Sequence, residues 1–241
     1  MRSSRATLLS ALFPLALFAG AGPAAAAPVD GFEGGLPAGI DGSNGILIGF
    51  STFQGSGAVA IGTTSTPPAP VPGAAPGNQV LALDVDTDSF AGFVHVFENA
   101  AVDRLAPRDW SSFDTLTFWL YGHDSGAEMF IDLLDNREPG STGYPFELWT
   151  AAFVDDFSGW KAMSIAFADL TRKEIGNGAP NDGLGLTTAH GWALGTLATG
   201  GPRTYYVDDV RVVSMIPEPG TVALAGAGLL FVMRAVRRRR P

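Results

Sequence analysis

The sequence contains no cysteine and only three histidines, and it has just 15 lysines and arginines among 241 residues. The lack of cysteine excludes disulfides, thiolate metal sites and a cysteine nucleophile. The 24 aspartates and glutamates give a formal net charge of −9, which excludes the basic surface that nucleic-acid binding requires. The fold must therefore be stabilised by packing alone or with a bound ion.

Seven of the 15 basic residues lie at the two ends of the chain. Residues 27–216 hold only 8 basic residues against 23 acidic ones, which is a net charge of −15. This middle part, which we call the body, is long enough for one domain with a full hydrophobic core.

The N-terminal end, residues 1–26, has the layout of a secretory signal peptide. Arg2 and Arg5 precede a short apolar run, which is followed by small residues. We expect cleavage after Ala26, because a cut one bond later would leave Pro28 directly after it. A membrane-spanning anchor is the alternative, but a proline interrupts a run that is already short for a bilayer.

The C-terminal end, residues 217–241, combines three features in a fixed order. Pro217, Glu218 and Pro219 precede an apolar run, and five of the last eight residues are arginine. A helix over this run, with Arg234 snorkelling to the headgroups, is roughly 26 Å long and just spans a bilayer. The arginines then stay on the cytoplasmic side with the body outside. A buried core helix is the alternative, but the arginine cluster argues against it.

This order of a Pro-Glu-Pro triplet, a short apolar helix and an arginine cluster resembles the bacterial PEP-CTERM sorting signal. The resemblance implies a Gram-negative bacterium and a C-terminal transmembrane helix that anchors the protein transiently in the inner membrane. It also implies cleavage near the triplet by an exosortase and release to the cell surface or an extracellular matrix.

The body alternates apolar and polar residues with the period of a β-strand. Turn-forming stretches separate the alternating segments. The stretch Pro67–Pro76 lacks the backbone donors of a central strand and is expected to form a surface loop. The sequence predicts an all-β fold, an antiparallel β-sandwich or jelly roll. The predicted strands are Gly92–Glu98, Thr115–Tyr121, Glu128–Leu134, Glu147–Phe153, Lys161–Phe167 and Thr204–Val213.

Four stretches of the body, taken in order, resemble family 11 carbohydrate-binding modules and related galactose-binding-like jelly rolls. The resemblance implies a non-catalytic domain that binds polysaccharide, since such modules hold bacterial enzymes on a glucan. The stretches are Asp30–Glu33, Asp109–Trp119, Asp156–Leu170 and Tyr205–Val210.

The acidic body could also bind calcium, which prefers clustered carboxylate and carbonyl oxygens. Related jelly rolls hold a structural calcium between the first and last strands. By motif position, this resemblance implies Glu33 and Asp209 as ligands, with Asp30 and Asp84 as additions. The alternative is that Asp208 and Asp209 only solvate an edge strand.

Sugar recognition needs flat apolar side chains beside fixed polar groups. Alternation places Phe130 and Asp132 on the outward face of one strand, while Leu116 and Met129 are expected in the core. If the outward faces form one concave sheet, they make a sugar groove; core packing is the alternative for each aromatic side chain. The expected groove residues are Trp119, Tyr121, Asp132, Trp149 and His95, with Arg137 and Tyr144 at the rim.

The sequence carries no motif of a serine hydrolase, zinc protease or P-loop enzyme. Adjacent carboxylates such as Asp155 and Asp156 do not supply the ~5–9.5 Å separation across a cleft that glycoside hydrolysis needs. We therefore expect an exported, surface-sorted protein that binds a polysaccharide, such as a β-glucan or a matrix exopolysaccharide, without catalysis. The alternatives are a structural matrix or biofilm protein without a soluble ligand, and a glycan-active enzyme.

Overall fold

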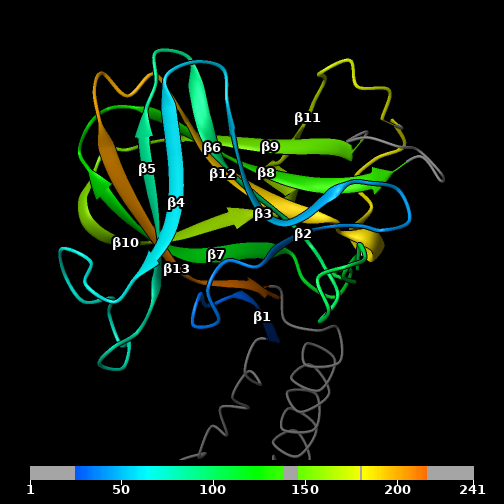
Figure 1. Cartoon of the computed structure of the whole chain (residues 1–241), viewed down its shortest axis with the longest axis horizontal. Coiled ribbons are helices and arrows are strands. Elements are labelled where there is room, and N and C mark those ends of the chain that lie inside the picture. Colours follow the sequence, from blue (N-terminus) through cyan, green and yellow to red (C-terminus); the bar gives the residue numbers. More distant parts are fainter. Residues whose placement is uncertain (1–24, 138–145, 180, 216–241) are drawn as a thin grey trace, which may run out of the picture. The chain divides into compact units, whose positions relative to one another are not determined.

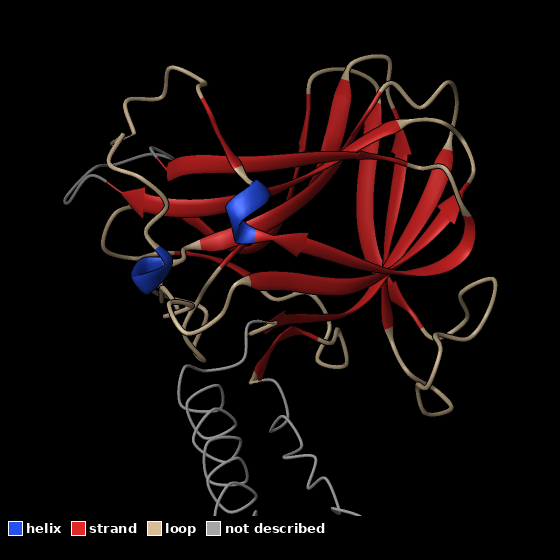
Figure 2. Cartoon of the chain, turned by 180° about the vertical axis from the view of Figure 1, so that it is seen from behind, coloured by secondary structure: helices blue, strands red, loops and turns tan. Residues whose placement is uncertain are grey.

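The computed structural model describes residues 25–137, 146–179 and 181–215 (Figure 1). Thirteen strands in these residues form two antiparallel sheets that face each other. Short 3-10 helices, η1 (Phe167–Asp169) and η2 (Leu186–Thr188), are the helices of this part of the chain (Figure 2). The prediction of an all-β antiparallel sandwich is confirmed.

The first sheet has six strands, and its edge strand β1 (Ala26–Asp30) pairs with β13. The other five strands lie in the order β10 (Ser158–Ala166), β7 (Thr115–His123), β13 (Arg203–Val213), β5 (Val80–Asp86) and β4 (Ala58–Thr64).

The second sheet has seven strands, and it carries the hollow described below. Its strands lie in the order β11 (Thr171–Lys173), β9 (Phe146–Val154), β8 (Glu128–Arg137), β12 (Gly191–Leu197), β6 (Phe90–Val96), β3 (Leu47–Gln54) and β2 (Ala38–Ile40).

The core lies between the two sheets, and the alternation of the sequence explains it. Leu116 and Leu120 on β7 are fully buried, as are Met129 and Ile131 on β8. Successive side chains of a strand point to opposite faces, so each strand contributes every second residue to this core. The inward residues expected on these two strands are confirmed.

The six strands predicted from alternation are all present, with ends that differ by a few residues. The segment between β4 and β5 is a loop, as expected for Pro67–Pro76. Trp160 on β10 fixes this loop by donating from Nε1 to the carbonyl of Ala69 at 2.7 Å.

The two ends of the chain lie almost wholly outside the described residues. This holds for the predicted signal peptide up to residue 24 and for the predicted sorting segment, residues 217–241. Within the described ranges, no helix has the length and apolar character to cross a membrane.

Candidate functional site

The outer face of the seven-stranded sheet carries a hollow of about 630 Å³, which we call the Phe130 hollow. Strands β3, β6, β8, β9, β11 and β12 contribute to it, so it crosses most of the sheet. Most of its lining is apolar, and Phe90 and Leu197 stay 42% and 37% exposed. Its polar side chains are Glu128, Asp132, Thr150, Lys173 and Asn177.

Two glycines make room for the floor of the Phe130 hollow. Gly92 on β6 pairs with Gly195 on β12, and the flanking residues in the same row are Phe53 on β3 and Phe130 on β8. A Cβ atom on Gly195 would lie 2.3 Å from the ring of Phe130, and one on Gly92 would lie 2.7 Å from the ring of Phe53. The two rings therefore lie over the glycines, with centroids 6.1 Å apart. They form an aromatic floor.

Asp132 is a buried carboxylate in this hollow, with its side chain only 6% exposed. Its Oδ2 atom accepts a hydrogen bond from Nζ of Lys173 at 3.0 Å. Its Oδ1 atom is buried and has no hydrogen-bond partner. Because a buried polar atom without a partner is destabilising, Oδ1 is an acceptor that a ligand can satisfy.

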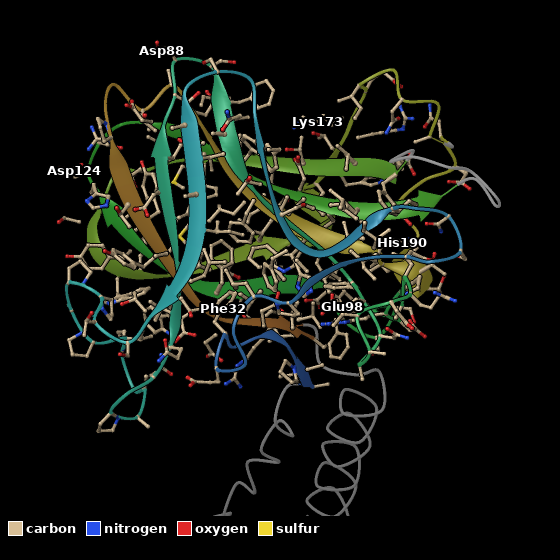
Figure 3. All side chains as sticks on the ribbon, viewed as in Figure 1. Phe32, Asp88, Glu98, Asp124, Lys173 and His190 are labelled. Atoms are coloured by element: carbon tan, nitrogen blue, oxygen red, sulfur yellow. The ribbon has the colours of Figure 1, made fainter. Side chains whose placement is uncertain are left out.

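Lys173 supplies the positive charge of the Phe130 hollow from the edge strand β11 (Figure 3). Its ammonium lies 4.4 Å from the centroid of the Phe130 ring. An ammonium has three N–H donors, and the bond to Asp132 uses one of them. With its side chain 36% exposed, Lys173 can donate to a ligand as well.

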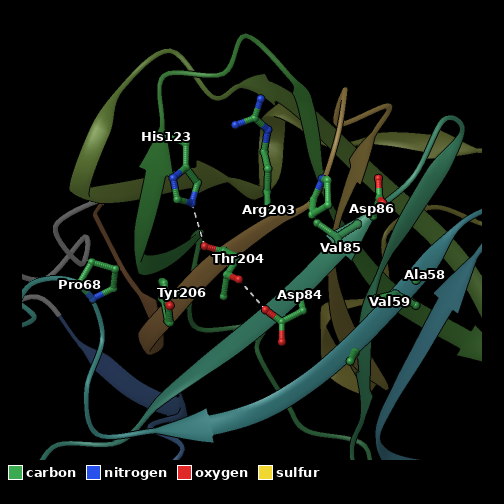
Figure 4. A pocket seen from close by; sticks show the side chains of 12 residues that line it. Ala58, Val59, Pro68, Asp84, Val85, Asp86, His123, Arg203, Thr204 and Tyr206 are labelled. Carbon is green, nitrogen blue, oxygen red and sulfur yellow. Dashed lines mark hydrogen bonds between the residues drawn. The ribbon is translucent and has the colours of Figure 1, made fainter.

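A second hollow, of about 460 Å³, lies on the outer face of the six-stranded sheet (Figure 4). We call it the Tyr206 hollow. His123 Nε2 lies 2.8 Å from the carbonyl of Thr204, whose hydroxyl donates to Asp84 at 2.5 Å. Burial raises the pKa of Tyr206, and the charge of Asp84 adds to this. His123, Thr204 and Asp84 thus form a chain of contacts in this hollow, in contrast to Asp132 Oδ1.

The structure does not bring the expected groove residues together. Trp119 and Tyr121 lie on the outer face of the six-stranded sheet, where Tyr121 contacts Trp160 and Tyr206 at ring distances of 5.5 and 5.9 Å. Asp132 lies on the outer face of the other sheet. The expectation of one shared concave face is wrong, because β7 and β8 follow each other in the chain but belong to different sheets.

His95 and Trp149 point into the core and not outward. His95 is 2% exposed and stacks on Phe50 at 4.0 Å between ring centroids. Trp149 stands opposite Leu133 on β8, and cross-strand partners share a face, so its ring packs against the core. The alternative weighed for each aromatic side chain, core packing, therefore applies to Trp149.

Of the two expected rim residues, Arg137 lies on a described strand and Tyr144 does not. Arg137 ends β8 and stands opposite Phe146, whose side chain lines the Phe130 hollow. Tyr144 lies outside the described residues.

Sequence reasoning missed most of the lining of the Phe130 hollow. Alternation did place Phe130 outward beside Asp132, and this was the available signal. Phe53, Phe90 and Lys173 come from strands that were not predicted or were predicted to begin later.

The four expected calcium ligands do not form one site. Glu33 and Asp209 line the same small hollow together with Asp208. Asp30 instead accepts hydrogen bonds from His95 and Trp192, and Asp84 accepts one from Thr204. Among the residues that the structure describes, no three His, Asp or Glu side chains are grouped to hold a metal ion.

The hollow of Glu33 and Asp209 nevertheless concentrates negative charge. Burial raises the pKa of Asp208 against a hydrogen bond from Asn78 that lowers it, and the charges of Asp209 and Glu33 raise it further. Asp209 also has a positive φ of 49° at an irregularity of β13.

Comparisons with known proteins fit this architecture. The family described as carbohydrate binding domain (family 11) matches residues 19–211, and the PEP-CTERM protein-sorting motif matches residues 216–240. A search of curated proteins found no match.

Two solved structures share the fold. One is a family 11 carbohydrate-binding module from Clostridium thermocellum in complex with a beta-1,3-1,4-mixed-linked tetrasaccharide. It is 17% identical, with a TM-score of 0.54 over 80% of this chain and 98% of that chain. The other is the family 11 module of the cellulosomal cellulase Lic26A-Cel5E of Clostridium thermocellum. It is 16% identical, with a TM-score of 0.50 over 74% of this chain and 95% of that chain.

Proposed function

Since the chain belongs to family 11 of the carbohydrate-binding domains, we propose that it binds a polysaccharide chain in the Phe130 hollow. The C-terminal sorting motif makes it a surface-sorted carbohydrate-binding protein. Within that class, we propose a β-glucan or a matrix exopolysaccharide as the partner.

The observation that carries this proposal is the unpaired Oδ1 atom of Asp132. A sugar hydroxyl is a donor of the right kind, and a hydrogen bond to a charged acceptor is among the stronger ones. The rings of Phe53 and Phe130 line the same hollow and offer apolar surface to the C–H face of a sugar ring. The hollow thus pairs an apolar floor with one unsatisfied polar atom.

We propose binding without catalysis. Of the two carboxylates in the hollow, Asp132 is held by the ammonium of Lys173 and Glu128 is exposed. A glycosidase needs one carboxylic acid kept protonated and a second carboxylate across the bond. Because Asp132 already accepts a hydrogen bond from Lys173, it is placed to position a ligand and not to act as one of such a pair.

We further propose the route by which the protein reaches its partner. The signal peptide exports the chain, and the C-terminal segment holds it in the inner membrane with the body outside. An exosortase then cleaves near Pro217, Glu218 and Pro219 and releases the body to the surface or matrix, where it retains polysaccharide.

Affinity electrophoresis of the full chain in mild detergent tests the binding proposal, with soluble polysaccharides cast in the gel. We expect retardation by at least one polysaccharide and a loss of affinity of about tenfold or more in Asp132→Ala. Tyr206→Ala, in the hollow of the other sheet, is the matched control and should bind as the wild type does. Unchanged binding by Asp132→Ala would place the polysaccharide elsewhere. Self-association without binding would favour a structural matrix protein.

A further inference from the structure

The lining of the Phe130 hollow is mostly apolar, with few polar groups to match the hydroxyls of a sugar. We infer that its ligand is a polysaccharide whose sugars carry O-acyl groups, such as acetyl esters, and that the same chain without them binds more weakly. This inference rests on the proposed function and names the substrate class of that site.

The shortage of polar partners is the first step. The hollow offers five polar side chains, and one of them, Lys173, already bonds to another, Asp132. Phenylalanine and aliphatic side chains make up the rest, including Ile175 and Phe90, which are 51% and 42% exposed. A sugar hydroxyl that is removed from water without gaining a partner weakens binding. A fully hydroxylated chain would leave several hydroxyls in that position.

Acylation makes a sugar more apolar and removes one of its hydrogen-bond donors, and both changes suit the lining of the hollow. An ester replaces a hydroxyl donor by a carbonyl acceptor and a methyl group, and it thereby removes a donor that the hollow cannot satisfy. The methyl group matches the exposed apolar surface of Phe90, Ile175 and Leu197.

The two polar features of the hollow suit the groups that remain. Lys173 has N–H donors beyond the one used by Asp132, and an ester carbonyl accepts such a bond. Oδ1 of Asp132 accepts and cannot donate when ionised, so it fits a free hydroxyl and not a carbonyl. Asp132 and Lys173 are themselves in contact, so an ester beside a free hydroxyl is the pattern they are placed to recognise.

The Tyr206 hollow shows what the Phe130 hollow lacks. Its lining includes Arg203, Asp84 and Asp86 beside the Tyr206 ring. These charged side chains and the phenol offer more hydrogen-bond partners to sugar hydroxyls than the Phe130 hollow does. A polysaccharide without acyl groups could bind there instead. The test below therefore has to distinguish the two hollows.

A matched pair of polysaccharides provides the experiment. An O-acetylated glucomannan and the same preparation after mild alkaline deacetylation share backbone and chain length and differ only in the esters. Affinity electrophoresis or calorimetry on the full chain in mild detergent gives the ratio of the two affinities. We expect the acetylated form to bind at least tenfold more tightly.

Variants locate the effect in the hollow. Phe90→Ala and Lys173→Gln should bring the ratio towards one, since the first removes apolar surface and the second the charge. Phe90 is exposed, so its truncation should not unfold the protein. Val154→Ala, an exposed residue outside the hollow, is the matched control and should keep the wild-type ratio.

The outcomes are separable. Equal binding of both forms would overturn the acyl inference and leave the proposed function intact. Tighter binding of the deacetylated form that is lost in Tyr206→Ala would overturn the inference and move the sugar site to the other sheet. If the folded protein binds neither form and no other polysaccharide, the proposed function is overturned and the inference with it. A dimer dissociated by Phe90→Ala would show that a second copy occupies the hollow.

Discussion

Nδ1 of His95 lies 2.8 Å from the carboxylate of Asp30, inside the sandwich. Asp30 ends β1 in the six-stranded sheet and His95 lies on β6 in the seven-stranded sheet, so the pair ties the two sheets together. Nε2 of the same ring lies 2.9 Å from Glu98. Because each ring nitrogen faces a carboxylate, the geometry favours the protonated imidazole, in which both nitrogens donate.

This arrangement predicts a pH dependence of stability. Burial acts to lower the pKa of His95, but the hydrogen bonds and charges of Asp30 and Glu98 outweigh it and raise the pKa above its ordinary value of 6.5. The raised pKa gives a stabilisation that is fully present below the unfolded-state pKa and is lost as pH rises through the folded-state pKa. The melting temperature difference between wild type and His95→Gln should therefore shrink above pH ~6.5. A difference that stays constant up to pH ~9 would contradict the protonated ring.

Replacement of the two tryptophans of the expected groove should have different consequences. Trp149 packs against the core, so Trp149→Ala should lower the free energy of unfolding by about 3 kcal/mol. Trp119 lies on the outer face of the six-stranded sheet, so Trp119→Ala should leave polysaccharide retention unchanged. Denaturant melts and affinity gels of both variants check this. Loss of retention in Trp119→Ala with an intact fold would restore it as a binding residue.

The aromatic floor can be disturbed without removing any of its side chains. In Gly195→Ala the new methyl group would meet the far end of the Phe130 ring, which has to move. We expect weaker polysaccharide binding with a modest loss of stability. Gly62→Ala on β4 is the matched control, because nothing lies within 4 Å of its added Cβ. Equal affinity of the two variants would show that the position of the Phe130 ring does not matter for binding.

Calcium remains a prediction that a chelator can test. If it binds, the hollow of Glu33, Asp208 and Asp209 is the place where two of the expected ligands meet. Calcium would then raise the melting temperature by mass action and EDTA would reverse the rise. Asp209→Asn should abolish this response, whereas Asp84→Asn, on the Tyr206 hollow, should keep it. A melting temperature that changes with neither calcium nor EDTA would contradict the predicted calcium site.

Alternation along each strand predicted the sandwich and many inward residues, but it could not assign strands to sheets. Trp119 and Asp132 both point outward, yet from opposite sides of the molecule, because the chain crosses from one sheet to the other between β7 and β8. Periodicity also leaves open which face of a strand points into the core. For this reason Trp149 was expected on the outer face, whereas its ring packs against the core.

Strand β12 shows a second limit of the sequence. Its glycines favour a loop when the segment is considered alone, since glycine is poor in strands. Gly195 is needed there because the ring of Phe130 occupies the space of a side chain. Such a requirement comes from a residue far away in the sequence, so local pattern cannot reveal it.

The pairing of β1 with β13 also sets an order of events during secretion. Ala26 stands opposite Val213 and Ala27 opposite Val212, so the bond expected to be cut after Ala26 lies inside a paired strand. A protease needs an extended, unpaired segment, which a strand within a folded sheet does not offer. If the chain is cut after Ala26 as predicted, the cut must come before β13, the last strand of the described residues, has paired with β1. Folding would then set the time of this predicted cleavage, which would shorten β1 by one residue.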